Sequence, residues 1–220
     1  LFASPAVFIL RDSRKDLGIC FLFLITPLLF YIYGSFYKDK FNISDKIIYD
    51  YKIRAISSNI SLDRFYTNLD PVSVINDLIK ISEPNKNEKI IFVWPEGILP
   101  NIFQKELIEY NWLFKENFSK NHLLVVGINS QKFDNKDVKY FNSLSVYDNN
   151  LNLLHSYNKI NLVPFGEFLP LENILKNTGL RTVTNNYQSF SSGDERNIME
   201  IKRENFSLKI LPLICYEIIY

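Results

Sequence analysis

The sequence is poor in the residues on which many kinds of functional site depend. Its 220 residues include two Cys, two His and one Met. Two cysteines cannot form a disulfide-rich scaffold, and two histidines leave little room for a His-based metal site. Glycine and proline are also few, at seven and nine residues, which excludes a collagen-like or linker-dominated chain.

An excess of charge of either sign is missing as well. The 25 Lys and Arg residues nearly balance the 24 Asp and Glu residues, and the formal net charge is +1. This balance gives no electrostatic reason to expect nucleic acid as a partner. Hydrophobic residues make up 47% of the chain and charged residues 22%. The chain can therefore bury a core, and it is not intrinsically disordered.

One long segment contains no charged residue at all. Residues 17–37 read LGICFLFLITPLLFYIYGSFY, and as a helix they would span roughly 31 Å, about the hydrocarbon thickness of a bilayer. The run is too long for a signal peptide and lacks a small-residue cleavage site; a buried core helix is the alternative. We predict a transmembrane helix here, with residues 1–16 as a cytoplasmic-side segment or the end of an upstream helix. Arg11, Arg14 and Lys15 favour that side as cytoplasmic, which puts the remainder on the outer, periplasm-like side.

From residue 38 to residue 220 the pattern changes to that of an α/β domain. Short apolar runs typical of buried strands alternate with segments of helical periodicity, which favours a layered architecture. The Asn- and Lys-rich stretches 84–89 and 131–137 are interpreted as surface loops. The predicted elements are a strand that begins within 47–60, a helix at 71–81, a strand at 89–94, a helix at 104–117, a strand at 122–128, paired strands at 140–147 and 151–157, and a strand at 207–215.

Three of these segments carry a reactive side chain beside a predicted strand. Glu96, Lys159 and Cys215 each lie next to such a run, and ligands in α/β sheets gather beyond the carboxyl ends of strands. A thiol has a pKa of about 8.5, which a nearby ammonium lowers, and a carboxylate can remove its proton as general base. A lysine can also stabilise the oxyanion that forms when the thiol attacks a carbonyl group. The trio would therefore make a nucleophilic site.

Each of the three residues also has an ordinary interpretation. A Cys at a strand end is commonly structural, a Glu after Pro is commonly a solvated loop residue, and a Lys in a loop is commonly solvated. A Cys–His hydrolase is a further alternative, but His122 opens a predicted strand and His155 fits the strand pair. Spacing alone does not decide between these interpretations.

Five segments in sequence order resemble a known family. They are WPEGILP at 94–100, FNSLSVYD at 141–148, YNKINLVPFGEFLPLE at 157–172, SSGDE at 191–195 and LPLICYEIIY at 211–220. Together they resemble the nitrilase, or carbon–nitrogen hydrolase, superfamily. They are most similar to its membrane branch, the apolipoprotein N-acyltransferases, of which the LVPFGEFLP extension is typical.

This resemblance implies an α/β fold, a nitrilase-like α-β-β-α sandwich preceded by one transmembrane helix. The family's domain continues past its nucleophile motif, so we expect residues 38–220 to be a C-terminally incomplete domain and the chain to be a fragment. One departure lies in the first motif, where Gly97 and Ile98 replace the Ser/Thr-Ala that usually follows WPE.

The resemblance also assigns roles to residues of this sequence. Glu96 would be the general base, Lys159 the lysine that stabilises the oxyanion, and Cys215 the nucleophile. Glu167 and Glu217 match carboxylates that support the site or its lid. Two further positions match residues that support the pocket: Tyr216 and Asn142.

The reaction implied is a two-step acyl transfer in the bacterial inner membrane, with the catalytic domain on the periplasmic side. Cys215 would take an acyl chain from a membrane phospholipid as a thioester. The amino group of an N-terminal diacylglyceryl-cysteine of an apolipoprotein would then accept it. The lipid bilayer is thus an expected partner, whereas nucleic acid, a metal and an organic cofactor are not implied. The alternatives are an inactive membrane-anchored remnant of that enzyme and a nitrilase-type amidase.

Overall fold

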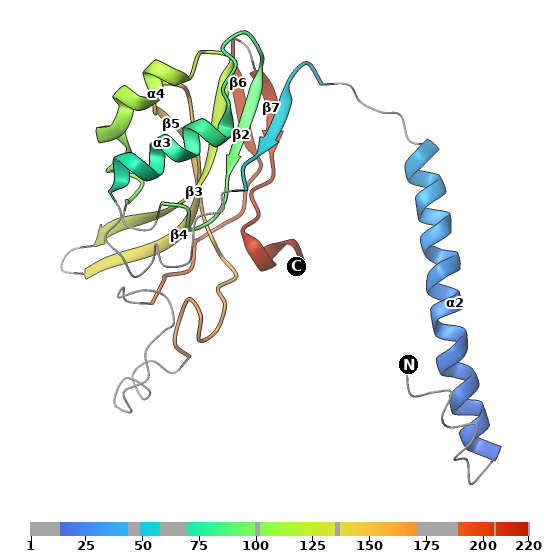
Figure 1. The fold of residues 1–220 in the computed structure, drawn as a ribbon. Helices are drawn as coiled ribbons and strands as arrows, with labels where there is room; N and C mark the ends of the chain where they lie inside the picture. The colour runs from blue at the N-terminus through green and yellow to red at the C-terminus, as the bar shows by residue number, and fades with distance from the viewer. Residues whose placement is uncertain are drawn as a thin grey trace. The chain divides into compact units, whose positions relative to one another are not determined.

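The structure, a computed structural model, describes residues 14–43, 49–57, 70–99, 102–134, 137–170, 189–204 and 206–219. The chain divides into two compact units, Leu1–Tyr49 and Asp50–Tyr220. Figure 1 shows a long helix in the first unit and a layered α/β arrangement in the second.

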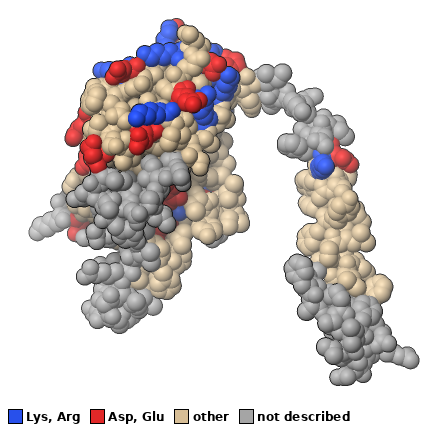
Figure 2. Space-filling model, viewed as in Figure 1, with Lys and Arg blue, Asp and Glu red and all other residues tan. Residues whose placement is uncertain are grey.

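The first unit contains one long helix, α2, which runs from Arg14 to Ile43. It begins before and ends after the helix predicted at residues 17–37. Within it, Phe21–Lys40 is long and apolar enough to cross a membrane, by length and composition. In the space-filling view, the part of this helix that is not grey is uncharged except near one end (Figure 2).

The second unit is built on a five-stranded mixed sheet in the order β1-β2-β3-β4-β5. The first three strands are parallel, and β3, β4 and β5 form an antiparallel meander. Two further strands, β6 and β7, pair with each other in an antiparallel ribbon. The bounds are β1 Lys52–Ala55, β2 Ile90–Trp94, β3 His122–Asp134, β4 Asp137–Tyr147, β5 Leu153–Asn158, β6 Met199–Arg203 and β7 Phe206–Ile210.

Four helical segments accompany the strands in the described part of this unit. They are α3 Pro71–Ser82, the 3₁₀ helix η2 Leu107–Tyr110, α4 Asn111–Asn117 and the 3₁₀ helix η4 Cys215–Ile219. The start of α3 follows from local chemistry, because Asp70 caps it by accepting hydrogen bonds from the N–H groups of Val72 and Ser73. Pro71 occupies the first turn, where its missing N–H costs nothing.

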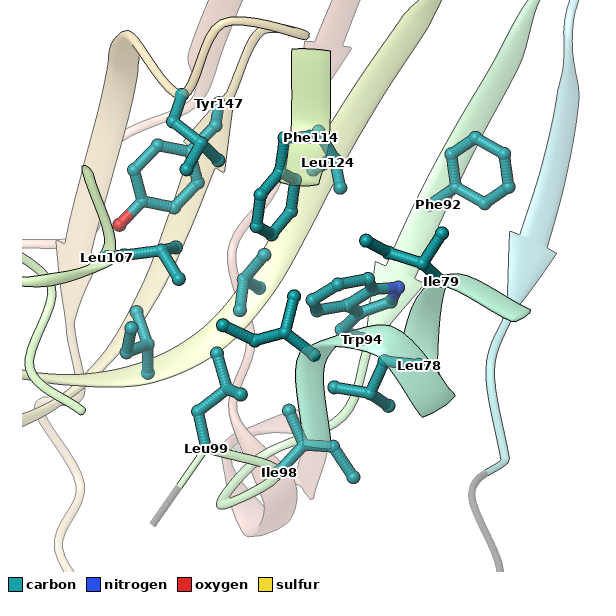
Figure 3. Packing of buried hydrophobic residues seen from close by; sticks show 14 of the residues in the cluster. Leu78, Ile79, Phe92, Trp94, Ile98, Leu99, Leu107, Phe114, Leu124 and Tyr147 are labelled. Atoms are coloured by element: carbon teal, nitrogen blue, oxygen red, sulfur yellow. The ribbon is translucent and has the colours of Figure 1, made fainter. Parts of the chain in front are cut away.

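Alternating side chains of the sheet enter two separate cores. Ile90, Phe92 and Trp94 of β2 pack with residues of α3 and α4 (Figure 3). Ile91 and Val93 point to the opposite face, where they pack with residues of β6 and β7. Burial on both faces explains why β2 is a continuous apolar run. The described residues thus form three layers, with helices on one face of the sheet and the β6–β7 ribbon on the other.

Several predictions from the sequence are confirmed. The α/β class is correct, the helix predicted at 71–81 is α3, and the strand predicted at 89–94 is β2. The strands predicted at 140–147 and 151–157 are β4 and β5, which pair antiparallel as expected.

The surface loop predicted at 131–137 is wrong. Residues 131–134 continue β3, and residue 137 opens β4; the two strands stay paired as far as Asp134 opposite Asp137. Phe133, opposite Val138, is largely exposed. Lys132 and Phe133 are exposed although they lie in a strand, so polar composition here reflects solvent exposure and not the absence of a strand.

Three other element predictions need correction. The helix predicted from 104 starts only at Leu107, because the Glu106 carboxylate accepts a hydrogen bond from the N–H of Phe103 and closes a turn first. The strand predicted at 207–215 ends at Ile210. Two residues later, Pro212 has no N–H and cannot donate a hydrogen bond to a neighbouring strand. β6 was not predicted. Of the segment 47–60, only Lys52–Ala55 is a strand, and residues 47–48 and 58–60 lie outside the described residues.

Candidate active site

The first predicted site residue, Glu96, lies in the turn that directly follows β2. Its side chain is exposed, and its main chain packs closely against Gly127 of β3. A Cβ atom at position 127 would lie 2.6 Å from the Cα and 2.8 Å from the N of Glu96. Only glycine permits this approach, and sequence reasoning did not select Gly127. The signal was a glycine inside an otherwise buried strand, which indicates that another backbone segment lies close.

Asn142 joins two of the predicted carboxylates through one amide group. It lies in β4, is buried, and its Nδ2 donates hydrogen bonds to Oε1 of Glu96 at 2.5 Å and to Oε1 of Glu167 at 2.6 Å. The amide therefore fixes the exposed carboxylate of Glu96 relative to the buried one of Glu167.

Lys159 directly follows β5 and is 1% exposed. Its main-chain N–H donates to the carbonyl oxygen of Asn142 at 2.8 Å. Its Nζ lies 3.0 Å from Oε1 and 2.9 Å from Oε2 of Glu167. An ammonium buried without an anion would be very costly, so this pair is what allows Lys159 to be charged inside the protein. Glu167 is held in turn by the N–H of Val163 at 2.9 Å.

Cys215 opens η4 with an exposed side chain and a positive φ of 53°. Such left-handed backbone is uncommon for residues with a Cβ, and it concentrates at functional sites because surrounding structure must hold it in place. Tyr216, the next residue, is 57% exposed, so it is not one of the buried members of the site.

Glu217 connects the Cys215 turn to the loop that carries Lys159. Its carboxylate is fully buried. It accepts hydrogen bonds from the hydroxyl of Tyr157 and from the N–H groups of Ile160, Asn161 and Ile214, at 2.7, 2.9, 3.2 and 3.0 Å. Burial acts to raise the pKa of Glu217, but the hydrogen bonds outweigh burial and leave the pKa lowered. The group is therefore an anion at neutral pH.

The structure thus links six of the seven predicted site residues in two connected groups. Glu96, Asn142, Glu167 and Lys159 form one group through side-chain contacts. Glu217 ties the turn that holds Cys215 to the residues directly after Lys159. The catalytic roles that the sequence assigns to these residues stay predictions.

The two histidines make main-chain contacts instead. His122 is buried, with Nδ1 accepting from the N–H of Ser119 and Nε2 lying 2.9 Å from the carbonyl oxygen of Asn85. His155 Nε2 lies 2.8 Å from the carbonyl oxygen of Glu200. These contacts support the interpretation of both as residues of the strand framework. Within the described ranges, no group of three or more His, Cys, Asp or Glu side chains is arranged to hold a metal ion.

A second glycine and an arginine complete the site, and neither was selected as a site residue from the sequence. Gly193 donates its N–H to the carbonyl oxygen of Lys159 at 2.9 Å. A Cβ there would lie 2.1 Å from the carbonyl oxygen of Asn158. Arg196 lies 2.9 Å from Oε1 of Glu217. The signal for both was the SSGDE motif, which precedes Arg196 directly in the sequence.

Comparison with known proteins identifies relatives of this chain. No protein-family model matches the chain. Apolipoprotein N-acyltransferase of Wigglesworthia glossinidia brevipalpis is 33% identical over 180 residues, covering 77% of this chain and 33% of that protein. The enzyme of the same name from Brucella suis biovar 1 is 27% identical over 173 residues, covering 76% and 32%. That of Rhodopseudomonas palustris is 24% identical over 233 residues, covering 100% and 42%.

Solved structures with similar coordinates include the NitFhit protein of C. elegans, with a TM-score of 0.43 at 16% identity, covering 76% of this chain and 38% of that one. An N-terminal amidase with an Asn-Glu-Ala peptide has a TM-score of 0.39 at 15% identity, covering 71% and 38%. The chain spans about a third of the length of the first two curated relatives named above. The resemblance predicted from the motifs is confirmed by sequence similarity, and the chain is a relative of the apolipoprotein N-acyltransferases.

Proposed function

We propose that this protein, as part or whole of an enzyme, transfers an acyl chain from a membrane phospholipid to the amino group of an N-terminal diacylglyceryl-cysteine. The observation that carries the proposal is the contact of Asn142 with both Glu96 and Glu167, because it joins the predicted base to the predicted lysine. The names of the relatives support the reaction class.

In the first step, Cys215 is the nucleophile. Glu96 accepts the thiol proton as Sγ attacks the ester carbonyl carbon of the phospholipid. The ammonium of Lys159 stabilises the negative oxygen of the tetrahedral intermediate. The bond from the carbonyl carbon to the glycerol oxygen then breaks, and that oxygen takes the proton from Glu96. The products are a thioester on Cys215 and a lysophospholipid.

In the second step, the amino group of the diacylglyceryl-cysteine attacks the thioester carbonyl. Glu96 accepts a proton from the amine, and the carbon–sulfur bond breaks. An amide forms, and the proton returns to the sulfur, which regenerates the thiol. The same three groups serve both steps, since each passes through a tetrahedral oxyanion.

Both proposed substrates are anchored in lipid, so a helix that holds the protein at the membrane would bring it close to them. The stretch Phe21–Lys40 is long and apolar enough to cross a bilayer. We propose that it holds the protein in the bacterial inner membrane and that the part of the chain after it, up to residue 220, forms the catalytic, nitrilase-like domain on the periplasmic side. Arg11, Arg14 and Lys15, which precede the apolar stretch, support this orientation.

The experiment uses the full chain in membranes supplied with a phospholipid that carries an alkyne-labelled acyl chain. We expect a label on the protein that neutral hydroxylamine removes, since hydroxylamine cleaves thioesters. The variant C215A should lack the label, and the matched variant C20A should keep it, because position 20 lies in α2. A label that persists in C215A would exclude Cys215 as the nucleophile.

A second measurement separates the proposal from the amidase and remnant alternatives. Addition of a synthetic diacylglyceryl-cysteine peptide should discharge the label and yield an N-acylated peptide. Release of ammonia from small amides without lipid would favour an amidase. A stable membrane-bound chain that never acquires label would favour a remnant.

A further inference from the structure

Arg196 lies between the Gly193 turn and β6, and it contacts two buried groups of the site. Its Nη2 is 2.9 Å from Oε1 of Glu217, and its Nε donates to the hydroxyl of Tyr157 at 3.2 Å. The guanidinium also lies over the Tyr157 ring, 5.9 Å from the ring centroid. The neighbouring Tyr157 hydroxyl and Glu217 carboxylate raise the pKa of Arg196 further, so the side chain is a permanent cation.

The contact matters because of what the Glu217 carboxylate holds. Its Oε1 accepts from the N–H groups of Ile160 and Asn161, and its Oε2 accepts from the N–H of Ile214. The first two residues follow Lys159, and the third precedes Cys215. One carboxylate therefore fastens together two segments that are far apart in the sequence.

The loop that carries Lys159 makes a second contact, with Gly193, three residues before Arg196. The N–H of Gly193 donates to the carbonyl oxygen of Lys159, and its Cα packs directly on Asn158. The main chain on both sides of Lys159 is thus in contact with the Gly193–Arg196 stretch. This places the guanidinium in a fixed position relative to the lysine loop.

We propose that Arg196 is a positioning residue: it keeps Glu217 anionic and thereby holds the Cys215 turn against the Lys159 loop. The inference rests on the proposed function, in which Cys215 and Lys159 act on the same carbonyl group. It adds a residue that touches neither the substrate nor the reacting atoms.

The physical basis is the cost of a buried carboxylate without a cation. An ionised Glu217 is favoured by its hydrogen bonds and by Arg196, and removal of one partner from a buried pair leaves the other charge uncompensated. Without the guanidinium, Glu217 would bind a proton at higher pH. A protonated carboxyl group accepts more weakly, so the N–H groups of Ile160, Asn161 and Ile214 would open to solvent.

The chain offers a matched set of variants. R196Q removes the charge and keeps part of the hydrogen bonding, whereas R196K keeps the charge and loses the fork of donors. K202Q is the control, because Lys202 is an exposed cation that pairs with Glu200 at 3.2 Å in β6, outside the site. All are made in the full chain in detergent.

The first measurement is amide hydrogen exchange, which does not require activity. In R196Q, we expect protection to fall about tenfold, equivalent to ~1.4 kcal/mol, in peptides that cover residues 160–161 and 214–217, and to fall more at pH 5 than at pH 7. R196K should lose less protection, and K202Q should match the wild type. Peptides from β2 and β3 should keep their protection in all variants.

The second measurement is the pH dependence of acyl-thioester formation on Cys215. We expect the acidic limb of R196Q to shift upward by about one pH unit relative to the wild type. Unchanged protection in R196Q at both pH values would overturn the proposal, and so would an equal loss across the whole sheet. If the exchange results are as expected but the wild type forms no thioester, the proposed function fails and the role of Arg196 in holding the two segments stands.

Discussion

The ammonium of Lys159 lies within 3.0 Å of both carboxylate oxygens of Glu167, and both side chains are buried. Two opposite charges at this separation inside a protein are each other's main compensation for lost hydration. Glu167 also accepts from Asn142, so the pair is connected to the exposed carboxylate of Glu96. The proposed catalytic lysine is therefore held by the same hydrogen-bond network as the proposed base.

Breaking this pair should destabilise the domain strongly. In E167Q, Lys159 is left as a buried cation without an anion, and we expect the free energy of unfolding to fall by ~3–5 kcal/mol. Urea unfolding of the full chain in detergent, followed by the fluorescence of buried Trp94, measures this change. The double variant K159M/E167Q should recover much of the loss, because no unpaired charge remains. A double variant as unstable as E167Q would contradict this account.

Removal of the Asn142 side chain should destabilise the protein less than its conversion to a carboxylate. In N142A, Glu96 loses one hydrogen bond, and we expect thioester formation to fall while the fold is kept. In N142D, a third carboxylate faces Glu96 and Glu167, whose oxygens lie 2.5 and 2.6 Å from the present amide nitrogen. Repulsion between like charges should make N142D the less stable variant at pH 7, with a difference that narrows at pH 4.5. A difference that does not depend on pH would argue against repulsion.

Gly127 should not accept a side chain. A Cβ at this position would meet the Cα of Glu96 at 2.6 Å, and the three nearest atoms are all backbone atoms of Pro95 and Glu96, which leaves no flexible group to yield. We expect G127A to lose ~1–3 kcal/mol of unfolding free energy, as in other overpacked sites, and to lose thioester formation because Glu96 is displaced. The control is G34A in α2, where nothing lies within 4 Å of the added atom. That variant should retain both properties.

The sequence predicted those parts of the fold that short-range patterns encode. α3 has a capping Asp70, a Pro in its first turn and helical apolar spacing, and β2 is a short apolar run, so both were predicted almost to the residue. The α/β class followed from the alternation of such segments. β6 was missed because only Met199 and Ile201 of its five residues are buried, which leaves little apolar signal.

The candidate site was predicted from motifs, and its geometry was not. Order along the chain gave Glu96, Lys159 and Cys215, but no spacing rule gives the amide of Asn142 between two carboxylates. Arg196 lies 21 residues before Glu217 by number, and its contact depends on how the intervening β6–β7 ribbon folds back. Such tertiary contacts are set by packing, which periodicity does not describe.

Buried His122 should make the domain less stable in mild acid. Burial is the main cause that lowers its pKa from 6.5, while its hydrogen bond to the carbonyl oxygen of Asn85 acts in the opposite direction. Between the lowered folded pKa and the unfolded value of 6.5, the unfolded chain binds a proton that the folded chain does not. The free energy of unfolding therefore falls as pH drops below 6.5 toward the folded pKa.

The measurement is the urea midpoint of the full chain at several values from pH 7.5 to pH 5. We expect the midpoint to fall below pH 6.5 in the wild type and to vary less in H122Q, because glutamine at position 122 does not bind a proton. Glu217 does not contribute to the change in midpoint between pH 7.5 and pH 5, because its lowered pKa affects stability only below its unfolded value of 4.5. H155Q is the control, and it should keep the wild-type slope. An identical slope in H122Q and the wild type would show that another group causes the loss.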